Sequence, residues 1–352
     1  MDYQLGQRGR ASIDFLIDLR LVSNKLEPPA EQFAADSGFK FPDAPETFQN
    51  DFDSLHKEAL AVLNESSDFR VLSLCRDWML DQHGQIAMDA FEEIREQLVP
   101  QLGALASGSV SLALDESLSL PGYWDGYEFH RSSGGWDGHD YMGFVHGELI
   151  HFHMVGRSLA GVLHAQRVAA AQAAPVEAPG TILEMGCASG QFTQALTEVY
   201  PDASITALDL SPRQLEQTMR RGNEQGFDWT LLQANAEDTG LDPERFDLVC
   251  SYAMFHELPV QAATAVLHEK FRLLKPGGVM LMADVKSYSA HRGAQLWNAD
   301  YWNQVKGGDP FWREYATTDF AALAADAGFT DVSWGGHGEH AYPFILTGRK
   351  PS

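Results

Sequence analysis

The sequence predicts an α/β protein with a mainly helical N-terminal domain followed by a doubly wound, seven-stranded Rossmann-like sheet. Three observations predict it. Apolar residues recur at three- and four-residue spacing in the first half, and short apolar runs alternate with helical patterns in the second half. Between them, the stretch RVAAAQAAPVEAPG is typical of a helix that ends in a short linker. We therefore expect two domains, residues 1–174 and 175–352.

The first half shows the apolar spacing of amphipathic helices and little of the alternation typical of strands. We expect this domain to cover a substrate site and to form a homodimer. Its predicted helices are Ser12–Ser23, Asp51–Leu63, Val71–Leu80 and Gln85–Leu98.

The second half alternates strands with helices, which indicates parallel strands joined by crossover helices. Ser211 and Pro212 are typical of an N-cap and a first helical position. The predicted strands are Thr181–Met185, Ser204–Leu210, Trp229–Gln233, Phe246–Ser251, Val279–Asp284, Asp331–Trp334 and Tyr342–Gly348. The predicted helices are Gly190–Tyr200, Ser211–Glu224, Val260–Leu274 and Thr318–Ala327.

The composition of the chain disfavours nucleic acids and membranes as partners. The 352 residues carry 49 acidic and 25 basic side chains, a formal charge of −24, which disfavours nucleic acid as a partner. No apolar run approaches the ~20 residues that cross a bilayer, so we expect no membrane partner. Three widely spaced cysteines suit neither a disulfide framework nor a metal motif, and we expect a cytoplasmic protein.

The stretch TILEMGCASGQF (181–192) leads from a strand through small residues into a helix. Gly186 and Gly190 let the backbone approach a ligand, and the helix start offers unpaired N–H groups. Glu184 precedes them and would repel a pyrophosphate. This disfavours an NAD-dependent dehydrogenase, which stays an alternative. Asp209 ends the next strand, where a carboxylate can accept hydrogen bonds from both ribose hydroxyls.

The ordered segments ILEMGCASG, LDLSP, NAED, RFDLVCSYAMFHEL and LLKPGG resemble class I S-adenosylmethionine-dependent methyltransferases over Thr181 to Arg349. The resemblance implies S-adenosylmethionine as cofactor and in-line transfer of its methyl group to an oxygen, sulfur or carbon atom of a small-molecule acceptor. A non-catalytic protein that binds S-adenosylmethionine or S-adenosylhomocysteine is the alternative.

The same resemblance assigns the cofactor-binding residues. Glu184 would meet the methionine amino group, Asp209 the ribose hydroxyls, and Asn235 the adenine amine, where the family usually has aspartate. The amide oxygen of Asn235 can still accept that hydrogen bond. The other expected cofactor contacts are Gly186, Cys187, Gly190, Leu210, Ala236, Glu237 and, near the sulfonium, Ser251.

Candidate catalytic residues are His256, after the fourth predicted strand, and Tyr141 and His146 in the first half. The last two belong to Pro121–His153, in which five of the 13 histidines fall within 24 residues among Trp, Tyr and Gly. We interpret this run as a substrate lid. The alternative is that Phe144–Leu163 is a helix packed into the core, and that His256 is structural.

A second aromatic run, Trp297–Tyr315, follows the fifth predicted strand. Its aromatic side chains and Arg313 suit an aromatic or carboxylate-bearing substrate, with core packing as the alternative. We expect no metal ion. The alternative is a divalent ion held by His256, Asp284 and His291, residues without the tight spacing of a metal motif.

Overall fold

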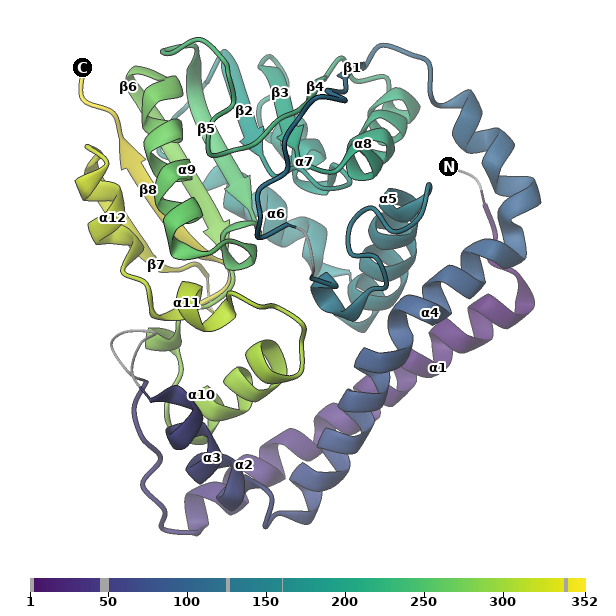
Figure 1. Cartoon of the computed structure of the whole chain (residues 1–352), viewed down its shortest axis with the longest axis vertical. Helices are drawn as coiled ribbons and strands as arrows, with labels where there is room; N and C mark the ends of the chain where they lie inside the picture. Colours follow the sequence, from purple (N-terminus) through teal and green to yellow (C-terminus); the bar gives the residue numbers. More distant parts are fainter. Residues whose placement is uncertain (1–2, 45–50, 125–126, 160, 339–340) are drawn as a thin grey trace.

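The computed structural model describes residues 3–44, 51–124, 127–159, 161–338 and 341–352. Its centre is an eight-stranded sheet with the order β1-β4-β3-β2-β5-β6-β8-β7 (Figure 1). All neighbouring strands are parallel except β8, which is antiparallel to both β6 and β7. The strands are β1 Ser111–Ala113, β2 Thr181–Met185, β3 Ser204–Asp209, β4 Thr230–Gln233, β5 Phe246–Tyr252, β6 Leu274–Asp284, β7 Thr330–Gly336 and β8 Phe344–Arg349.

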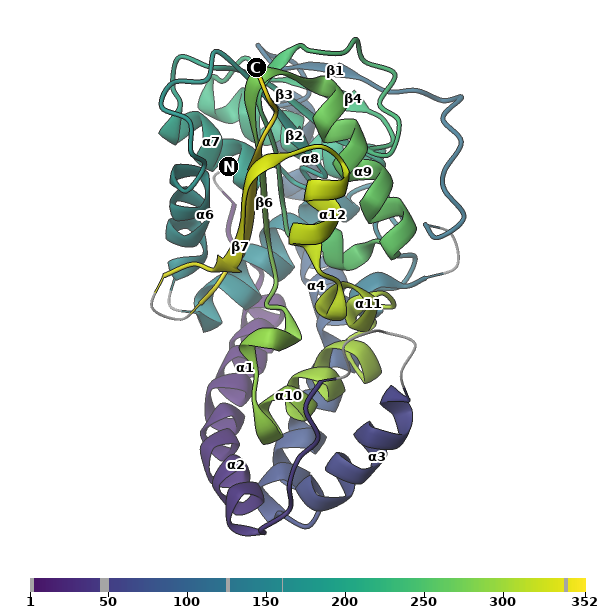
Figure 2. The ribbon, with the colours of Figure 1, turned by 90° about the vertical axis from the view of Figure 1, so that its left-hand side faces the viewer.

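Helices cover both faces of the sheet, as expected of a doubly wound fold. Figure 2 sees the sheet nearly edge-on, with α6 Val162–Gln172 and α7 Gln191–Val199 on one side and α9 Val260–Leu273 and α12 Phe320–Asp326 on the other. The remaining helix of the sheet region, α8 Pro212–Gln225, begins at Ser211, whose hydroxyl accepts a hydrogen bond from Gln214 N at 3.1 Å. This confirms the predicted N-cap.

The N-terminal helices lie below the sheet in Figure 1. Two long helices, α1 and α4, pack side by side, while short helices join them to the segment that follows β6 (Figure 2). No helix among the described residues is long and apolar enough to cross a membrane. The elements are α1 Gln7–Ser23, η1 Asn24–Leu26, α2 Glu27–Asp36, α3 Phe52–Leu63, α4 Ser67–Ala104, η2 Phe129–Arg131, α5 Met142–Phe144 and the π-helical η3 Val145–Gly156.

The seven predicted strands correspond to β2–β8, which confirms the predicted sheet. The sequence missed β1, which pairs in parallel with β4 at the sheet edge and comes from the first half of the chain. Three residues are too few to show an alternation. The helical spacing of Val71–Leu80 and Gln85–Leu98 is confirmed, and both segments lie within one 38-residue helix, α4.

The predicted boundary at residue 174 stays a prediction. On its N-terminal side, α6 packs on α7, and Tyr200 donates a hydrogen bond to Ala171 O at 2.8 Å. Val110, Ala170 and Ala174 share the hydrophobic core on that face of the sheet. The first half of the chain therefore also contributes to the sheet layer.

A buried ion pair in the segment after β6 also contacts the N-terminal helix α3. In that segment, α10 Gly293–Asp300, η6 Tyr301–Val305 and α11 Trp312–Thr317 follow one another. Arg313 donates to both carboxylate oxygens of Asp300 at 2.7 and 2.9 Å and to Asp53 at 2.7 Å. Asp300 also accepts a hydrogen bond from Tyr288 at 2.6 Å and lies 2.6 Å from His56 Nδ1 in α3.

Removing one partner of this pair should destabilise the fold. Because Asp300 is fully buried, Arg313→Met removes the guanidinium that compensates its charge, and we expect the free energy of unfolding in urea to fall by about 3–5 kcal/mol. The control is Arg95→Met, which breaks an exposed pair with Glu92 and should cost at most about 1 kcal/mol. Equal losses in the two variants would contradict a stabilising role for the buried network.

Candidate active site

A cavity of about 100 Å³ lies at the carboxyl ends of β2, β3, β4 and β5. Ligands of open α/β sheets bind at this edge, where the strand order reverses. The structure brings residues predicted from three separate strand ends into the wall of this one cavity, hereafter the donor cavity. They are Gly186, Asp209, Leu210, Asn235 and Ala236.

The loop after β2 requires its two glycines. Gly186 has φ 71°, and a Cβ there would lie 2.5 Å from the sulfur of Met254. Gly190 has φ 82°, and its Cβ would lie 2.8 Å from a methyl group of Thr218. Between them, Cys187 is buried in the core of the sheet, and this burial raises the pKa of its thiol. Cys187 therefore shapes the loop as a small apolar side chain.

Asp209 is held by the loops on both sides of it. Its carboxylate accepts hydrogen bonds from Ala188 N at 2.8 Å and from Ser211 N at 2.9 Å. Burial raises the pKa of Asp209 to about 6, although these two N–H groups oppose that shift. The group is therefore still mainly ionised at neutral pH and presents a fixed negative charge to the donor cavity.

Glu184 is a fully buried carboxylic acid behind the same loop. Thr193 donates a hydrogen bond to Oε2 at 2.6 Å, while Oε1 is buried and has no partner among the described residues. Burial raises the pKa of Glu184 to about 8. A cationic amine bound beside it would supply both a hydrogen bond and a compensating charge.

The other predicted cofactor contacts are already hydrogen-bonded within the protein. Asn235 Oδ1 accepts from Glu237 N at 3.0 Å, and Glu237 accepts from the Tyr123 hydroxyl at 2.8 Å. Ser251 is buried in β5, where Lys270 donates to its hydroxyl at 2.8 Å. Burial lowers the pKa of Lys270 to about 7.

The segment predicted as a substrate lid contributes aromatic side chains to the wall of the donor cavity. Tyr123, Trp124, Phe129 and Trp136 line it, opposite the strand ends. Residues 125 and 126 of the predicted lid lie outside the described part of the chain. Sequence reasoning missed these aromatic side chains as donor-cavity residues, and it also missed Met254, although Met254 stands within the quoted segment SYAMFHEL.

Five ionisable side chains form a row where the lid meets the sheet. His130 in the lid lies 2.9 Å from Glu257 and 2.8 Å from Asp309, and His256 lies 3.2 Å from Glu257 and 2.6 Å from Asp284. Burial alone would lower the pKa of His256, but Asp284 and Glu257 raise it to about 10. In the absence of a bound ion, His256 is therefore protonated and positively charged at neutral pH.

The other two predicted catalytic residues lie apart from each other. His146, in η3, lies edge-on to Trp136 with ring centroids 4.4 Å apart, and its Nδ1 is buried without a hydrogen-bond partner in the described structure. Burial lowers its pKa well below the usual value, so it is neutral. Tyr141 packs on Phe91 with ring centroids 5.3 Å apart, inside the hydrophobic cluster around α4.

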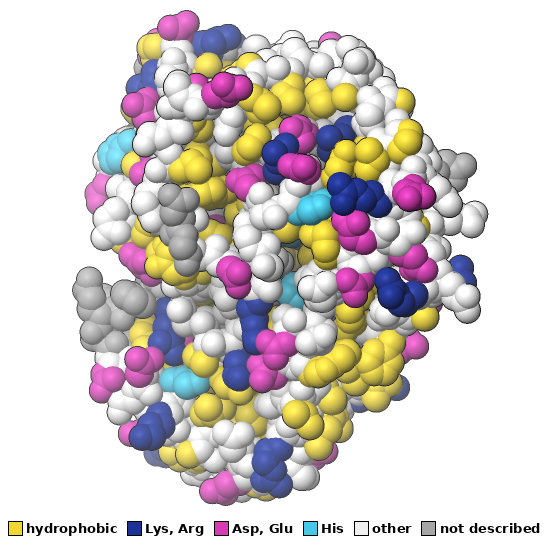
Figure 3. All heavy atoms as spheres, turned by 45° about the vertical axis from the view of Figure 1, so that its right-hand side comes forward, with side chains coloured by type: hydrophobic (Ala, Val, Ile, Leu, Met, Phe, Trp, Pro, Cys, Tyr) yellow, Lys and Arg dark blue, Asp and Glu magenta, His cyan; other side chains and the backbone are white. Residues whose placement is uncertain are grey.

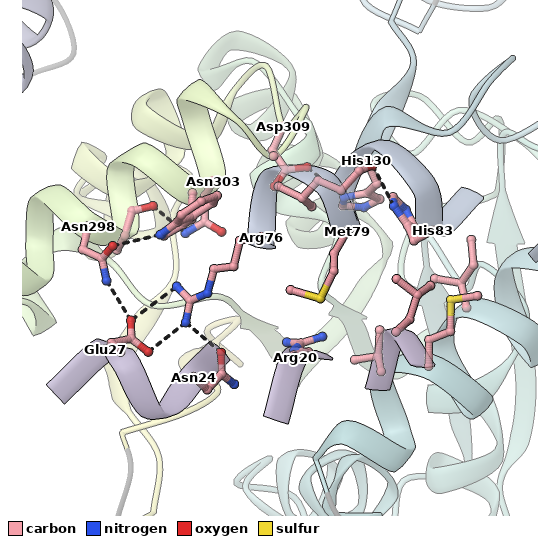
Figure 4. Close-up of a pocket in the computed structure, with 18 of the residues that line it drawn as sticks. Arg20, Asn24, Glu27, Arg76, Met79, His83, His130, Asn298, Asn303 and Asp309 are labelled. Carbon is pink, nitrogen blue, oxygen red and sulfur yellow. Dashed lines mark hydrogen bonds and ion pairs between the residues drawn. The ribbon is translucent and has the colours of Figure 1, made fainter. Parts of the chain in front are cut away.

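A second cavity, of about 730 Å³, lies between the N-terminal helices and the segment after β6. Figure 4 shows Arg20, Met79 and His83 on one part of its wall and Asn298, Asn303 and Asp309 on another. We call it the acceptor cavity. Part of the predicted run Trp297–Tyr315 lines it, but Arg313 is bonded to Asp300 instead. Its apolar wall includes Leu16, Ile17, Met79, Leu80, Ile150, Met154 and Val155.

Of the cationic side chains that line the acceptor cavity, Arg76 has an ion-pair partner among the described residues, whereas Arg20 and Lys286 do not. Arg76 donates to Glu27 at 2.9 Å and to Asn24 at 2.9 Å, as the dashed lines in Figure 4 show. Arg20 and Lys286 also line the cavity and form no ion pair with any described side chain. Burial, and then the nearby Arg76 charge, lowers the pKa of Arg20. An anionic group would compensate these cations.

Comparisons with known proteins agree on the sheet region. Residues 182–278 match the family model of a methyltransferase domain. The chain is 34% identical over 105 residues to a probable phthiotriol/phenolphthiotriol dimycocerosates methyltransferase 2 of Mycobacterium ulcerans, covering 30% of this chain and 39% of the relative. It is 35% identical over 121 residues to a trans-aconitate 2-methyltransferase of Methylobacterium radiotolerans, covering 34% and 44%. The chain thus spans less than half the length of these curated relatives.

Among solved structures, a putative O-methyltransferase of Nostoc punctiforme superposes with a TM-score of 0.45 at 15% identity, over 58% of this chain and 61% of that one. The family assignment depends on the sequence match and on the strand order, with the matched residues forming the strand ends around the donor cavity. The match confirms the resemblance of this part of the chain to class I S-adenosylmethionine-dependent methyltransferases.

Proposed function

We propose that the protein methylates a small molecule held in the acceptor cavity, with S-adenosylmethionine in the donor cavity. The observation that carries this proposal is that the two cavities meet at one pair of side chains. Glu257 lines the donor cavity, His130 lines the acceptor cavity, and the two side chains lie 2.9 Å apart. A donor and an acceptor on either side of this pair would be close neighbours.

The donor cavity fits this cofactor chemically. Asp209 lines the cavity and offers a carboxylate for ribose hydroxyls. Glu184 is buried behind the loop and does not line the cavity, but its Oε1 has no partner in the described structure and could accept a hydrogen bond from the methionine amine. A side chain at Gly186 would collide with Met254, so the glycine keeps the loop compact there. When bound, S-adenosylmethionine supplies an electrophilic methyl group on its sulfonium.

The acceptor cavity favours an amphipathic anion. Arg20 and Lys286 offer cationic groups without an ion-pair partner among the described residues, while Leu16, Ile17 and Met154 offer an apolar wall. A guanidinium binds a carboxylate through paired, charge-assisted hydrogen bonds. We therefore propose an acceptor with an apolar body and a carboxylate or similar anionic group.

The residues between the cavities would exclude water and hold the proton that a protonated nucleophile must lose. Phe129 and Trp136 close the donor cavity from the lid side. Both ring nitrogens of His256 face carboxylates, so we propose that it positions Glu257. His146 is neutral with a free Nδ1, and we propose that it accepts the proton.

We also propose a homodimer through α1 and α4. Phe15 and Val22 on α1 and Val71, Leu74 and Trp78 on α4 are 40–73% exposed, and the last three lie on one helix face. Figure 3 shows hydrophobic side chains gathered toward its lower right, with acidic and basic side chains interspersed elsewhere on that face. A cytoplasmic location also stays a proposal, supported by three free cysteines.

Asp209→Asn should weaken cofactor binding. The amide keeps one acceptor oxygen but loses the charge, so calorimetry with S-adenosylhomocysteine should show about 1–3 kcal/mol weaker binding. The control is Asp202→Asn on the exposed turn before β3, which should bind like the parent. Unchanged affinity in a folded Asp209→Asn protein would exclude a direct contact with the cofactor.

Arg20→Met should impair recognition of the acceptor. In an assay of S-adenosylhomocysteine release across hydroxylated aromatic and aliphatic carboxylic acids, we expect turnover with at least one of them. For that acid the variant should show a KM raised about tenfold or more, because a charge-assisted hydrogen bond is lost. An anionic acceptor would be contradicted if S-adenosylhomocysteine were released as fast with the methyl esters of these acids as with the acids. It would also be contradicted if none of the acids led to release.

Leu74→Glu combined with Val22→Glu should convert the proposed dimer to a monomer, since two charges would then lie in an apolar interface. Light scattering coupled to size exclusion should change from near twice 38.9 kDa to 38.9 kDa. Leu114→Glu, 44% exposed and just after β1, is the control and should stay dimeric. A monomeric parent protein would refute the dimer.

A further inference from the structure

His130, His256 and Glu257 have the arrangement of a metal site. One ligand atom of each lies within 4.8 Å of the other two. Glu257 Oε1 is 2.9 Å from His130 Nε2 and 3.2 Å from His256 Nε2. Protein ligands about 2.0–2.2 Å from a divalent ion lie roughly 3 Å from one another, so little movement is needed to admit an ion.

The second ring nitrogen of each histidine is already oriented by a carboxylate. Nδ1 of His130 lies 2.8 Å from Asp309, and Nδ1 of His256 lies 2.6 Å from Asp284. Metal-ligating histidines usually donate their other N–H to such a carboxylate, which fixes the tautomer and directs the free nitrogen at the ion. Both imidazoles show this pattern, and both Nε2 atoms are directed at Glu257.

Two further observations point to a ligand between these groups. Glu257 Oε2 is buried and has no hydrogen-bond partner in the described structure, so the carboxylate has spare coordinating capacity. His130 and the next residue, Arg131, have backbone φ angles of 52° and 56°. Residues other than glycine rarely adopt this left-handed conformation. Strained backbone of this kind is concentrated at functional sites. Here it directs His130 toward Glu257.

We propose that His130, His256 and Glu257 bind one divalent first-row transition metal ion at the boundary between the donor and acceptor cavities. Two imidazoles and one carboxylate suit Zn²⁺ or Fe²⁺ and leave coordination positions open. This set replaces the alternative of His256, Asp284 and His291, because Asp284 faces Nδ1 of His256 and His291 is not in the cluster.

The position of the ion gives it a role that depends on the proposed function. His130 lines the acceptor cavity and Glu257 the donor cavity, so an open coordination position would meet an acceptor oxygen. A metal ion lowers the pKa of a bound hydroxyl group and holds it in place. The hydroxyl proton would pass to His146, and the oxygen would form its bond to the methyl carbon as the bond from that carbon to the sulfonium sulfur breaks. S-adenosylhomocysteine would be the leaving group, and no oxidant or reductant is needed.

The test is metal binding to the full-length protein. After removal of metal by EDTA, calorimetric titration with Zn²⁺ should show one tight site per chain, and Co²⁺ should give visible absorption bands from a protein-bound ion. Glu257→Gln and His130→Ala should each weaken Zn²⁺ binding about 100-fold or more, and Asp309→Asn about tenfold. Because His130 is partly exposed, its truncation keeps the test valid should Glu257→Gln fail to fold.

Two controls separate this site from adventitious binding. His164→Ala removes an exposed histidine on α6, and His291→Ala tests the alternative set, so both should bind Zn²⁺ like the parent. The proposal would be overturned if the parent protein had no tight Zn²⁺ site. It would also be overturned if Glu257→Gln and His130→Ala bound Zn²⁺ as tightly as the parent. Titrating S-adenosylhomocysteine into the same preparations tests the proposed function separately, since either ligand can bind without the other.

Discussion

The row of ionisable side chains from Asp309 to Asp284 is the constraint that determines how the lid meets the sheet. Burying a carboxylate costs several kcal/mol unless charge and hydrogen bonds compensate it, and this row contains three. The two imidazoles between them supply the compensation, whether as imidazolium groups or as ligands of an ion. Withdrawal of His130 would leave Asp309 without an ion-pair partner among the described residues and Glu257 with His256 as its remaining one, so the arrangement in which His130 contacts both carboxylates is electrostatically favoured.

The same row explains why the acceptor cavity is built from both halves of the chain. Asp284 ends β6 and also accepts hydrogen bonds from Met254 N and Phe255 N at 3.0 and 2.7 Å, which fixes the loop after β5. Asp309 belongs to the segment after β6, which Arg313 ties to α3 through Asp53. The sheet therefore positions the inserted segment, and that segment positions the N-terminal helices.

The sequence predicted what depends on local patterns. The strands β2 to β8 are short apolar runs between turn residues, and the residues that follow the parallel strands among them fall at one edge of the sheet. That is why Gly186, Asp209 and Asn235 could be placed together without a structure. In contrast, β1 has three residues, and its position depends on pairing with β4. No local pattern determines such an edge strand.

The row of ionisable side chains between the two cavities could be predicted only in part, because its members come from distant parts of the chain. His256 and Asp284 come from neighbouring strand ends, so the sequence could pair them, whereas His130 and Asp309 come from loops of different halves of the chain. Their meeting depends on the left-handed turn at His130 and on the hydrogen bond from its N–H to Gly308 O at 3.3 Å. A residue pair set by long-range loop contacts leaves no periodic trace in the sequence. The donor side of the site could thus be predicted from the strand ends, while the position of His130 beside Glu257 depends on loop contacts between the two halves of the chain.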